Sequence, residues 1–278
     1  MKIFITGITG FLGSHIAKKL KASYEVYGLG RKSIDFKGIK VFDLDLFDEV
    51  EKPDVIIMCH ASVSSGIFVA NNEDLFVGNV LFTEKVVNKF LDTKIIYVSS
   101  VSVYKRSDSE IDENSSIDPQ SEYAVSKLWG EKIIQKHTNS VIVRITSLFG
   151  NDMKENTLIP NYANQALDNK IIQVWGNGKR KQNYLHVSDA VKLLECLILN
   201  NSELKSEVFI GADSFEYSNF EVASIIAQLT NAKIEFVNED NSNSFFYKNN
   251  YTRNKLNWKP KIMLQQGISE YLEWKMKI

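Results

Sequence analysis

The sequence predicts an α/β protein in which a doubly wound parallel sheet is followed by a smaller C-terminal α/β domain. Residues 1–150 alternate between short apolar runs and segments whose apolar residues recur at helical spacing, a pattern typical of parallel strands joined by helical crossovers. A glycine-rich turn directly follows the first run. Beyond Gly150 the alternation loosens and Asn, Lys and Gln become dense, so residues 151–278 are expected to form the smaller domain.

The expected strands of the first domain are short and almost wholly apolar, as is typical of strands buried on both faces of a parallel sheet. They are expected at residues 2–6, 24–29, 39–42, 54–58, 94–98 and 140–145. Apolar residues spaced three or four apart predict helices at 14–21, 75–91 and 122–137. The polar, acid-rich segment 106–121 is expected to be an exposed loop.

Helices dominate the expected second domain. They are predicted at residues 158–167, 187–199, 218–229 and 264–276, and a strand at 171–175. Ser188 is expected to cap the helix 187–199. The Asn- and Ser-rich stretch 238–250 is expected to be a loop.

Composition excludes several classes of function. The 278 residues carry 33 basic and 34 acidic side chains, so no electrostatic footprint for nucleic acid or an anionic membrane is expected. No apolar run is long enough to span a bilayer and no signal-peptide cleavage site follows the N-terminus, which predicts a cytoplasmic protein. Cys59 and Cys196 form no CxxC or Cys/His cluster, so neither a disulfide framework nor a metal site is expected.

The turn between the first strand and the first helix has the spacing of a phosphate-binding loop. Glycines at 7, 10 and 13 allow a tight turn, close approach of a pyrophosphate, and close packing of helix on strand. The free amides and positive dipole end of the helix would then face the anion. We therefore expect a dinucleotide to contact Gly7, Thr9, Gly10, Phe11, Leu12 and Gly13.

The residues after the second strand bear on which dinucleotide binds. A carboxylate at this point favours a free ribose 2′-hydroxyl, whereas an arginine accommodates a 2′-phosphate. Here no acid follows, and Arg31 and Lys32 come at once, which favours NADP over NAD. Asp45 and Leu46 lie in a loop suited to the adenine edge.

Ligands of such sheets bind at the carboxyl ends of strands, so we expect His60, Ala61 and Ser62 to contact the cofactor and Ser100 to lie at the reacting centre. His60, Ala61 and Ser62 follow the strand 54–58, and Ser100 follows the strand 94–98. In the helix after that, Tyr123 and Lys127 are four residues apart and therefore share one face.

The glycine turn, Ser100 and the Tyr123-x-x-x-Lys127 pair together resemble the extended short-chain dehydrogenase/reductase family, most closely its nucleotide-sugar epimerases, dehydratases and reductases. The resemblance implies a Rossmann domain to which residues 186–205 return, and a substrate-binding second domain. It also implies that Asn79 contacts the cofactor and that Lys127 holds the nicotinamide ribose. Helices 75–91 and 122–137 resemble those that pair between subunits in this family, so a homodimer is expected.

The expected chemistry is proton transfer coupled to hydride transfer at a carbonyl carbon. The alkoxide left by an arriving hydride needs a proton, which Tyr123 can donate. Lys127 and the positive nicotinamide are expected to lower the pKa of Tyr123 from its ordinary value near 10. Ser100 is expected to hydrogen-bond the substrate oxygen, while His60 and His186 are expected to be structural and not catalytic.

Departures from the family pattern affect the expected substrate and reaction. Gln182 stands where UDP-sugar enzymes of the family have an arginine, and Ser147 where an asparagine is common. Arg180 or Lys181 would supply a substitute charge, and the alternative is that both are solvated turn residues. The expected substrate contacts are Ser102, Ser147, Asn161, Arg180 and Gln182.

The sequence favours one reaction and leaves alternatives to it open. Val101 and Ser102 follow Ser100 where the family's 4,6-dehydratases have an Asp-Glu pair, which argues against dehydration. With no acid after the second strand, we expect NADPH-dependent reduction of a keto group on a nucleotide-activated deoxysugar. The alternatives are a nucleotide-sugar 4-epimerase with bound NAD, and a reductase of a non-nucleotide carbonyl substrate or a cofactor-sensing binding protein.

Overall fold

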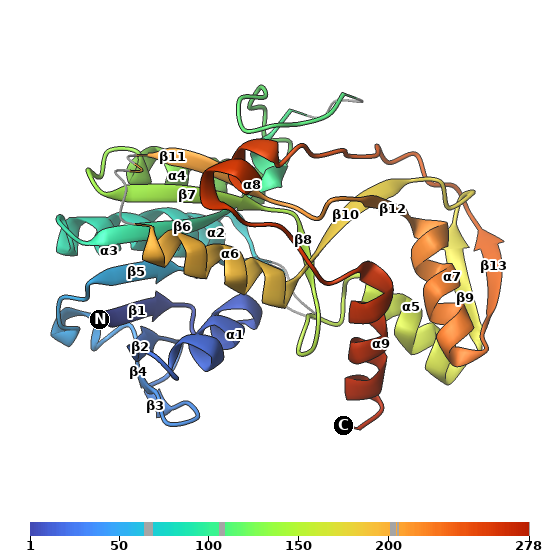
Figure 1. Cartoon of the computed structure of the whole chain (residues 1–278), viewed down its shortest axis with the longest axis horizontal. Helices are drawn as coiled ribbons and strands as arrows, with labels where there is room; N and C mark the ends of the chain where they lie inside the picture. Colours follow the sequence, from blue (N-terminus) through green and yellow to red (C-terminus); the bar gives the residue numbers. More distant parts are fainter. Residues whose placement is uncertain (64–68, 106–108, 201–203, 205, 278) are drawn as a thin grey trace.

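An eight-stranded sheet forms the larger part of the computed structural model, which describes residues 1–63, 69–105, 109–200, 204 and 206–277 (Figure 1). In spatial order its strands are β11 (Glu207–Gly211), β7 (Ser140–Ile145), β6 (Lys94–Ser100), β5 (Val55–Met58), β1 (Lys2–Thr6), β2 (Glu25–Leu29), β4 (Lys40–Phe42) and β3 (Ile34–Asp35). Neighbouring strands are parallel except β3 and β4, which are antiparallel. The predicted α/β class and doubly wound parallel sheet are thus confirmed.

Helices cover both faces of this sheet (Figure 1). On one face lie α1 (Phe11–Leu20) and α6 (Val187–Leu199), and on the other α3 (Phe82–Lys89) and α4 (Glu122–Ile134). The side chains of strand β1 explain this arrangement. Ile3 and Ile5 pack into the apolar cluster that includes residues of α1 and α6, while Phe4 packs into the apolar cluster on the other face of the sheet. Successive side chains of a strand point to opposite faces, so both faces of the strand must be apolar.

The predicted helix 75–91 is divided into three segments. It consists of α2 (Asn72–Leu75), a π-helical stretch η2 (Phe76–Leu81) and α3. Inside η2, Asn79 is fully buried and its side chain is hydrogen-bonded to both backbone groups of Ser62. Such π-segments are often found at functional sites, and this one lies beside the carboxyl end of β5.

The smaller lobe follows β7 in the chain and lies at one end of the sheet (Figure 1). Its strands form two small sheets, β12 (Glu216–Ser218) with β10 (Lys181–His186) and β8 (Ser147–Phe149), and β13 (Lys233–Val237) with β9 (Ile171–Trp175). Its helices are α5 (Leu158–Asp168), α7 (Asn219–Thr230) and α9 (Leu264–Lys275), which share one apolar core with these sheets. The short helix α8 (Asn250–Leu256) contacts α6 and β11 of the larger lobe.

The chain returns to the large sheet through α6, which packs on α1. The return extends to β11 at residues 207–211, beyond the expected limit of 205, and residues 201–203 and 205 lie outside the described residues. Helix α6 is capped by His186, not by Ser188 as predicted: the Ser188 amide donates to His186 Nδ1 at 3.3 Å.

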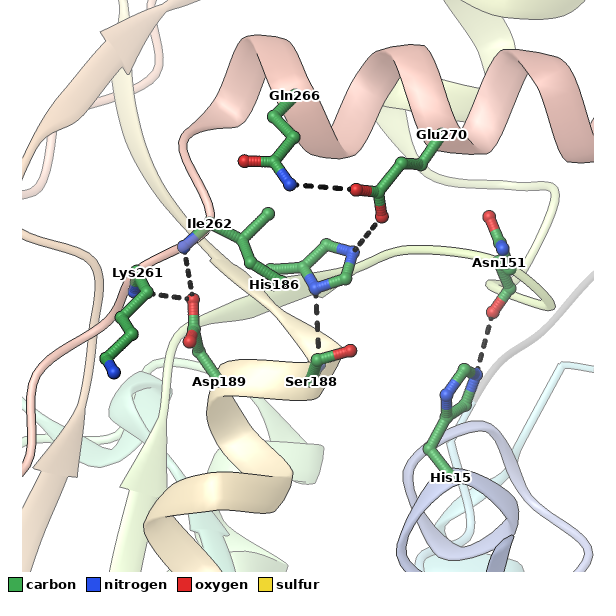
Figure 2. A network of polar contacts seen from close by, with 9 residues as sticks. All are labelled: His15, Asn151, His186, Ser188, Asp189, Lys261, Ile262, Gln266 and Glu270. Atoms are coloured by element: carbon green, nitrogen blue, oxygen red, sulfur yellow. Dashed lines mark hydrogen bonds and ion pairs between the residues drawn. The ribbon is translucent and has the colours of Figure 1, made fainter. Parts of the chain in front are cut away.

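The start of α6 also anchors the C-terminal segment (Figure 2). The amides of Lys261 and Ile262 donate to the buried Asp189 carboxylate at 3.0 and 2.9 Å. The Trp258 indole donates to the Asp189 carbonyl at 3.1 Å. Charge-assisted bonds of this kind hold the chain before α9 against the larger lobe. None of the helices in the described part of the chain has the length and apolar character needed to cross a membrane.

Candidate functional site

The turn after β1 has no room for a side chain at Gly7 or Gly13. Gly7 has a φ of +68°, and a Cβ on Gly13 would lie 2.2 Å from the Gly7 carbonyl oxygen. The Gly10 amide donates to the same oxygen at 2.9 Å. The turn therefore brings α1 directly against the end of β1, as the spacing predicts.

The N-terminus of α1 is open to an anion. Gly10 precedes the helix and offers no side chain to cap it, and the first turn contains no acidic residue. The first amides of a helix have no intrahelical partner, and at this helix no side-chain cap is made by its N-cap residue, so they are suited to bind an anion. Thr9 beside them is exposed. The sheet order reverses between β1 and β5 at this point, which is where open α/β sheets bind their ligands. These residues fit the pyrophosphate of a dinucleotide.

Positively charged side chains lie near the end of β2. Arg31 and Lys32 are both exposed. The pKa of Lys154 is lowered by burial and by the charge of Arg31, so a third cation lies near Arg31. In the neighbouring loop, the Leu46 amide donates to Asp43 at 3.1 Å, and Asp45 is exposed. The assignment of this region to the adenosine stays a prediction.

His60 at the end of β5 is held by hydrogen bonds within the protein, and its role at the cofactor stays a prediction. Its Nδ1 lies 2.7 Å from the Thr6 hydroxyl and its Nε2 lies 3.1 Å from the Thr83 hydroxyl. Burial, with a contribution from Lys127, lowers the pKa of His60 to about 3. The ring is therefore neutral at pH 7, and both of its nitrogens are engaged within the protein.

Asn79 holds the loop after β5 against helix α4. The Ser62 amide donates to Asn79 Oδ1 at 2.6 Å, and Asn79 Nδ2 donates to the Ser62 carbonyl and to Ser126 Oγ at 3.0 and 2.9 Å. Its side-chain bonds are thus made to the protein, while Ala61 beside this loop is exposed. The predicted contact of Asn79 with the cofactor stays a prediction.

Helix α4 presents the predicted Tyr-Lys pair. Ser121 caps the helix by accepting a hydrogen bond from the Ala124 amide at 3.2 Å, which places Tyr123 in the first turn. Lys127 follows one turn later and is 2% exposed, with its Nζ 4.2 Å from the centre of the Tyr97 ring. Burial lowers the pKa of the Lys127 ammonium to about 8.

The expected lowering of the pKa of Tyr123 is not found in the protein alone. Burial raises the pKa of the Tyr123 phenol to about 12. The low dielectric around the side chain disfavours the phenolate, and Lys127 does not offset this cost. Without further positive charge, Tyr123 is a neutral phenol at pH 7.

Ser100 ends β6 with its hydroxyl available as a donor. Its Oγ accepts hydrogen bonds from the Ser102 amide at 3.1 Å and from Ser102 Oγ at 2.9 Å. Since both bonds use its lone pairs, the Ser100 proton remains free to donate. The two serines form a short 3₁₀ turn, η3 (Val101–Val103), on which α4 packs.

A cavity of about 340 Å³ lies between the end of β6 and the smaller lobe. It brings together Ser100 and four of the five predicted substrate residues, Ser102, Ser147, Arg180 and Gln182. The fifth, Asn161, is exposed on α5 and does not line it. Its role stays a prediction, as do the roles of the other four.

Several cavity residues were not predicted from the sequence. They include Ile111, Gln120, Thr146, Phe245 and Tyr247. Segment 106–121, expected to be an exposed loop, is partly buried, because the Ile111 amide donates to the Phe246 carbonyl at 2.8 Å and Ile111 is 2% exposed. Residues 106–108 of that segment lie outside the described residues. The aromatic residues within an otherwise Asn- and Ser-rich stretch were the available signal.

The charge of the cavity comes from one side chain. Arg180 is the single charged residue among those described that line it, and Asp and Glu are absent from that set. Gln182 is fixed by bonds from its Nε2 to the Tyr184 hydroxyl and to Asn219 Oδ1, both at 3.0 Å. The cavity therefore combines neutral donors with one cation.

A model of the "NAD dependent epimerase/dehydratase family" matches residues 3–211. The chain belongs to this family. A dTDP-D-glucose 4,6-dehydratase of Dictyostelium discoideum is 29% identical over 82% of this chain, which spans 62% of that protein's length. One from Mus musculus is 26% identical, over 99% of this chain and 89% of its own.

Solved structures share the fold across the whole chain. UDP-glucuronic acid 4-epimerase from Bacillus cereus, in complex with UDP-glucuronic acid and NAD, has a TM-score of 0.88 at 18% identity and covers 100% of this chain and 99% of its own. MoeE5 in complex with UDP-glucuronic acid and NAD has a TM-score of 0.88 at 20% identity, with the same coverage. In the described part of the chain, no group of three or more His, Cys, Asp or Glu could hold a metal ion.

Proposed function

We propose that this protein is a nucleotide-sugar 4-epimerase that retains NAD. The observation that carries the proposal is the cavity at the end of β6, which offers the Ser100 hydroxyl and Arg180 but no carboxylate. The Bacillus cereus 4-epimerase and MoeE5, whose folds match this one, were solved with NAD and a UDP-sugar. This proposal replaces NADPH-dependent reduction as the leading interpretation.

Each protein group has a task in this reaction. Bound NAD would take a hydride from the sugar carbon and return it to the opposite face. Tyr123 would accept the proton of the sugar hydroxyl at its phenol oxygen and later return it. Lys127 would favour the phenolate form of Tyr123, and Ser100 would donate a hydrogen bond to the sugar oxygen as charge develops.

The cavity argues against dehydration even though the two curated relatives above are named as dehydratases. Removal of water requires an acid and a base placed on neighbouring substrate atoms. Val101 and Ser102 follow Ser100, and the described cavity residues contain no carboxylate. Among the described residues that line the cavity, no acid and base pair of this kind is present.

Reduction with NADPH remains a second candidate because of the cations after β2. Arg31 and Lys32 are exposed, Lys154 lies near Arg31, and no acid follows the strand. A ribose 2′-phosphate would be accommodated by such a group. An enzyme that consumes reduced cofactor would then act on a keto sugar.

The substrate would place its diphosphate near Arg180, the cation of the cavity. Its guanidinium can bind phosphate oxygens in a bidentate way. Gln182 beside it would contribute an uncharged contact. If the substrate carried no nucleotide, UDP, dTDP, CDP and GDP would all fail to raise the melting temperature of the protein.

The test is to incubate the purified protein and NAD with UDP-glucose, UDP-glucuronic acid and dTDP-glucose separately, and to follow the sugar signals by NMR. We expect the 4-epimer of at least one sugar, with no net formation of reduced cofactor. A parallel reaction supplies NADPH and 4-keto-6-deoxy nucleotide sugars. Oxidation of NADPH there, without epimer formation in the first set, would overturn the proposal in favour of the reductase.

A homodimer is part of the proposal. The side chains of Phe76, Val77, Leu81, Val125 and Trp129 are 39–52% exposed on η2 and α4. Of these, Phe76, Val125 and Trp129 line a groove of about 500 Å³ between α2, η2 and α4. An apolar face of this kind on paired helices is typical of a subunit interface.

A further inference from the structure

A buried ion pair lies beneath the proposed catalytic groups. Arg144 on β7 donates to Glu131 on α4 through Nε at 2.9 Å and Nη2 at 2.6 Å. Ser99 on β6 donates to the same carboxylate at 2.6 Å. Glu131 is 0% exposed, and Ser99 and Arg144 are each 4% exposed. One carboxylate therefore joins three elements of the larger lobe.

Each residue of this network adjoins a residue of the proposed site, either along the chain or in space. Ser99 immediately precedes Ser100, and Glu131 lies one turn after Lys127 on α4. The Arg144 guanidinium lies 4.6 Å from the centre of the Tyr104 ring, which lines the cavity. A movement of Glu131 would therefore displace Ser100 and Lys127 together.

The Glu131 carboxylate also acts on Lys127: it raises the pKa of the ammonium, against the larger lowering effect of burial. The titratable groups that face Lys127 are Cys59 and His60 at the end of β5, Tyr97 on β6, and Tyr123 and Glu131 on its own helix. Burial raises the pKa of Cys59 to about 12 and lowers that of His60 to about 3, and it raises those of Tyr97 and Tyr123. At pH 7 these four groups are neutral, so among the described residues the Glu131 carboxylate supplies the negative charge facing Lys127.

Stability alone does not account for such a pair. Removing two charges from water is costly, and well-packed apolar residues often serve a core equally well. Resting on the proposed function, we propose that Glu131 is a positioning residue, which ties the strand bearing Ser100 to the helix bearing Tyr123 and supplies the counter-charge of the Lys127 ammonium. Arg144 and Ser99 hold its carboxylate in place.

The test uses Glu131→Gln, which removes the charge and keeps the shape. The pKa of Lys127, followed by NMR of its labelled side chain in the full protein, is expected to fall by about one unit from its value near 8. In the epimerase assay, the alkaline limb of kcat is expected to move to lower pH and kcat to fall about 10- to 100-fold. KM is expected to change little, because Glu131 does not line the cavity.

Two further variants separate positioning from folding. Glu131→Gln leaves Arg144 without its carboxylate and is expected to lower Tm; Glu131→Gln with Arg144→Met removes both charges and is expected to restore Tm. We expect the altered Lys127 titration to persist in the double variant. Asp189→Asn, a change to another buried carboxylate, is the control that is expected to lower Tm without moving the Lys127 pKa.

The outcomes distinguish this inference from the proposed function. An unchanged Lys127 titration in Glu131→Gln would overturn the inference, whether or not the protein is an epimerase. Full recovery of the Lys127 titration in the double variant would also overturn it, because the network would then be structural only. Absence of epimer formation by the wild-type protein, with the Lys127 titration shifted as expected, would reject the epimerase and leave the counter-charge role supported.

Discussion

Burial acts in opposite directions on the two groups that α4 presents. It raises the pKa of Tyr123 to about 12 and lowers the pKa of Lys127 to about 8, so it favours the neutral form of both. The i, i+4 spacing predicted that these side chains share a face, but it did not predict how deeply they are buried. Burial depends on residues such as Tyr97, which precedes Tyr123 by 26 positions, and no local pattern reports it.

Replacing Lys127 tests the cost of burying its charge. Its folded pKa lies below the ordinary lysine value of 10.5, so the unfolded chain binds this proton more tightly. The cost of the charge to stability is then complete below about pH 8 and disappears as the pH rises toward 10.5. We expect Lys127→Met to raise the free energy of unfolding by about 1–3 kcal/mol at pH 7, and to abolish epimerisation.

Denaturant unfolding at pH 7 and near pH 10 measures this effect. The stability gain should shrink at the higher pH. A variant that is no more stable than the wild type at pH 7, or that gains equally at both pH values, would contradict the account of Lys127.

At the scale of elements, prediction succeeded where the apolar pattern was long. The strands 2–6, 140–145 and 171–175 match their predicted bounds. Strands such as β3 and β12 have only two or three residues, too few for a period to be visible. The π-helical stretch η2 was not predicted, and inside it Asn79 accepts a hydrogen bond from the Ser62 amide, a tertiary contact that local spacing does not report.

The glycine turn gives a prediction at this scale. A Cβ on Gly13 would lie 2.2 Å from the Gly7 carbonyl, whereas one on Gly10 would lie 3.1 Å from it. We expect Gly13→Ala to destabilise the protein by about 3 kcal/mol or more and Gly10→Ala by about 1 kcal/mol. Thermal unfolding without cofactor checks the order, and equal losses for the two variants would show that α1 does not pack against β1 as described.

At the scale of the whole molecule, the two lobes meet at the cavity. The way in which they pack together was the feature least predictable from the sequence. Phe245 and Tyr247 come from a polar stretch more than 140 residues after Ser100, yet they line the same space. The family resemblance indicated the glycine turn, Ser100 and the Tyr-Lys pair. The resemblance did not indicate which residues line the cavity on the side of the smaller lobe, because those depend on how that lobe packs.

The exposed apolar face of η2 and α4 leads to a prediction about assembly. Phe76 and Trp129 lie there with ring centres 5.5 Å apart. We expect the wild-type protein to sediment as a dimer, and Trp129→Glu to sediment as a monomer, because a buried unpaired charge opposes association. Phe236→Glu, on the distant strand β13, is the control and should remain dimeric; a monomeric wild-type protein would contradict the proposed interface.

The central claim is that the Tyr123 phenol moves the proton in an NAD-dependent reaction at a sugar carbon. The most direct measurement compares epimer formation by the wild-type protein and Tyr123→Phe, with NAD binding measured in both. We predict that Tyr123→Phe binds NAD normally but forms the 4-epimer about 10²- to 10⁴-fold more slowly. Equal rates for the two proteins, or a wild-type protein that binds no nicotinamide cofactor, would contradict the account.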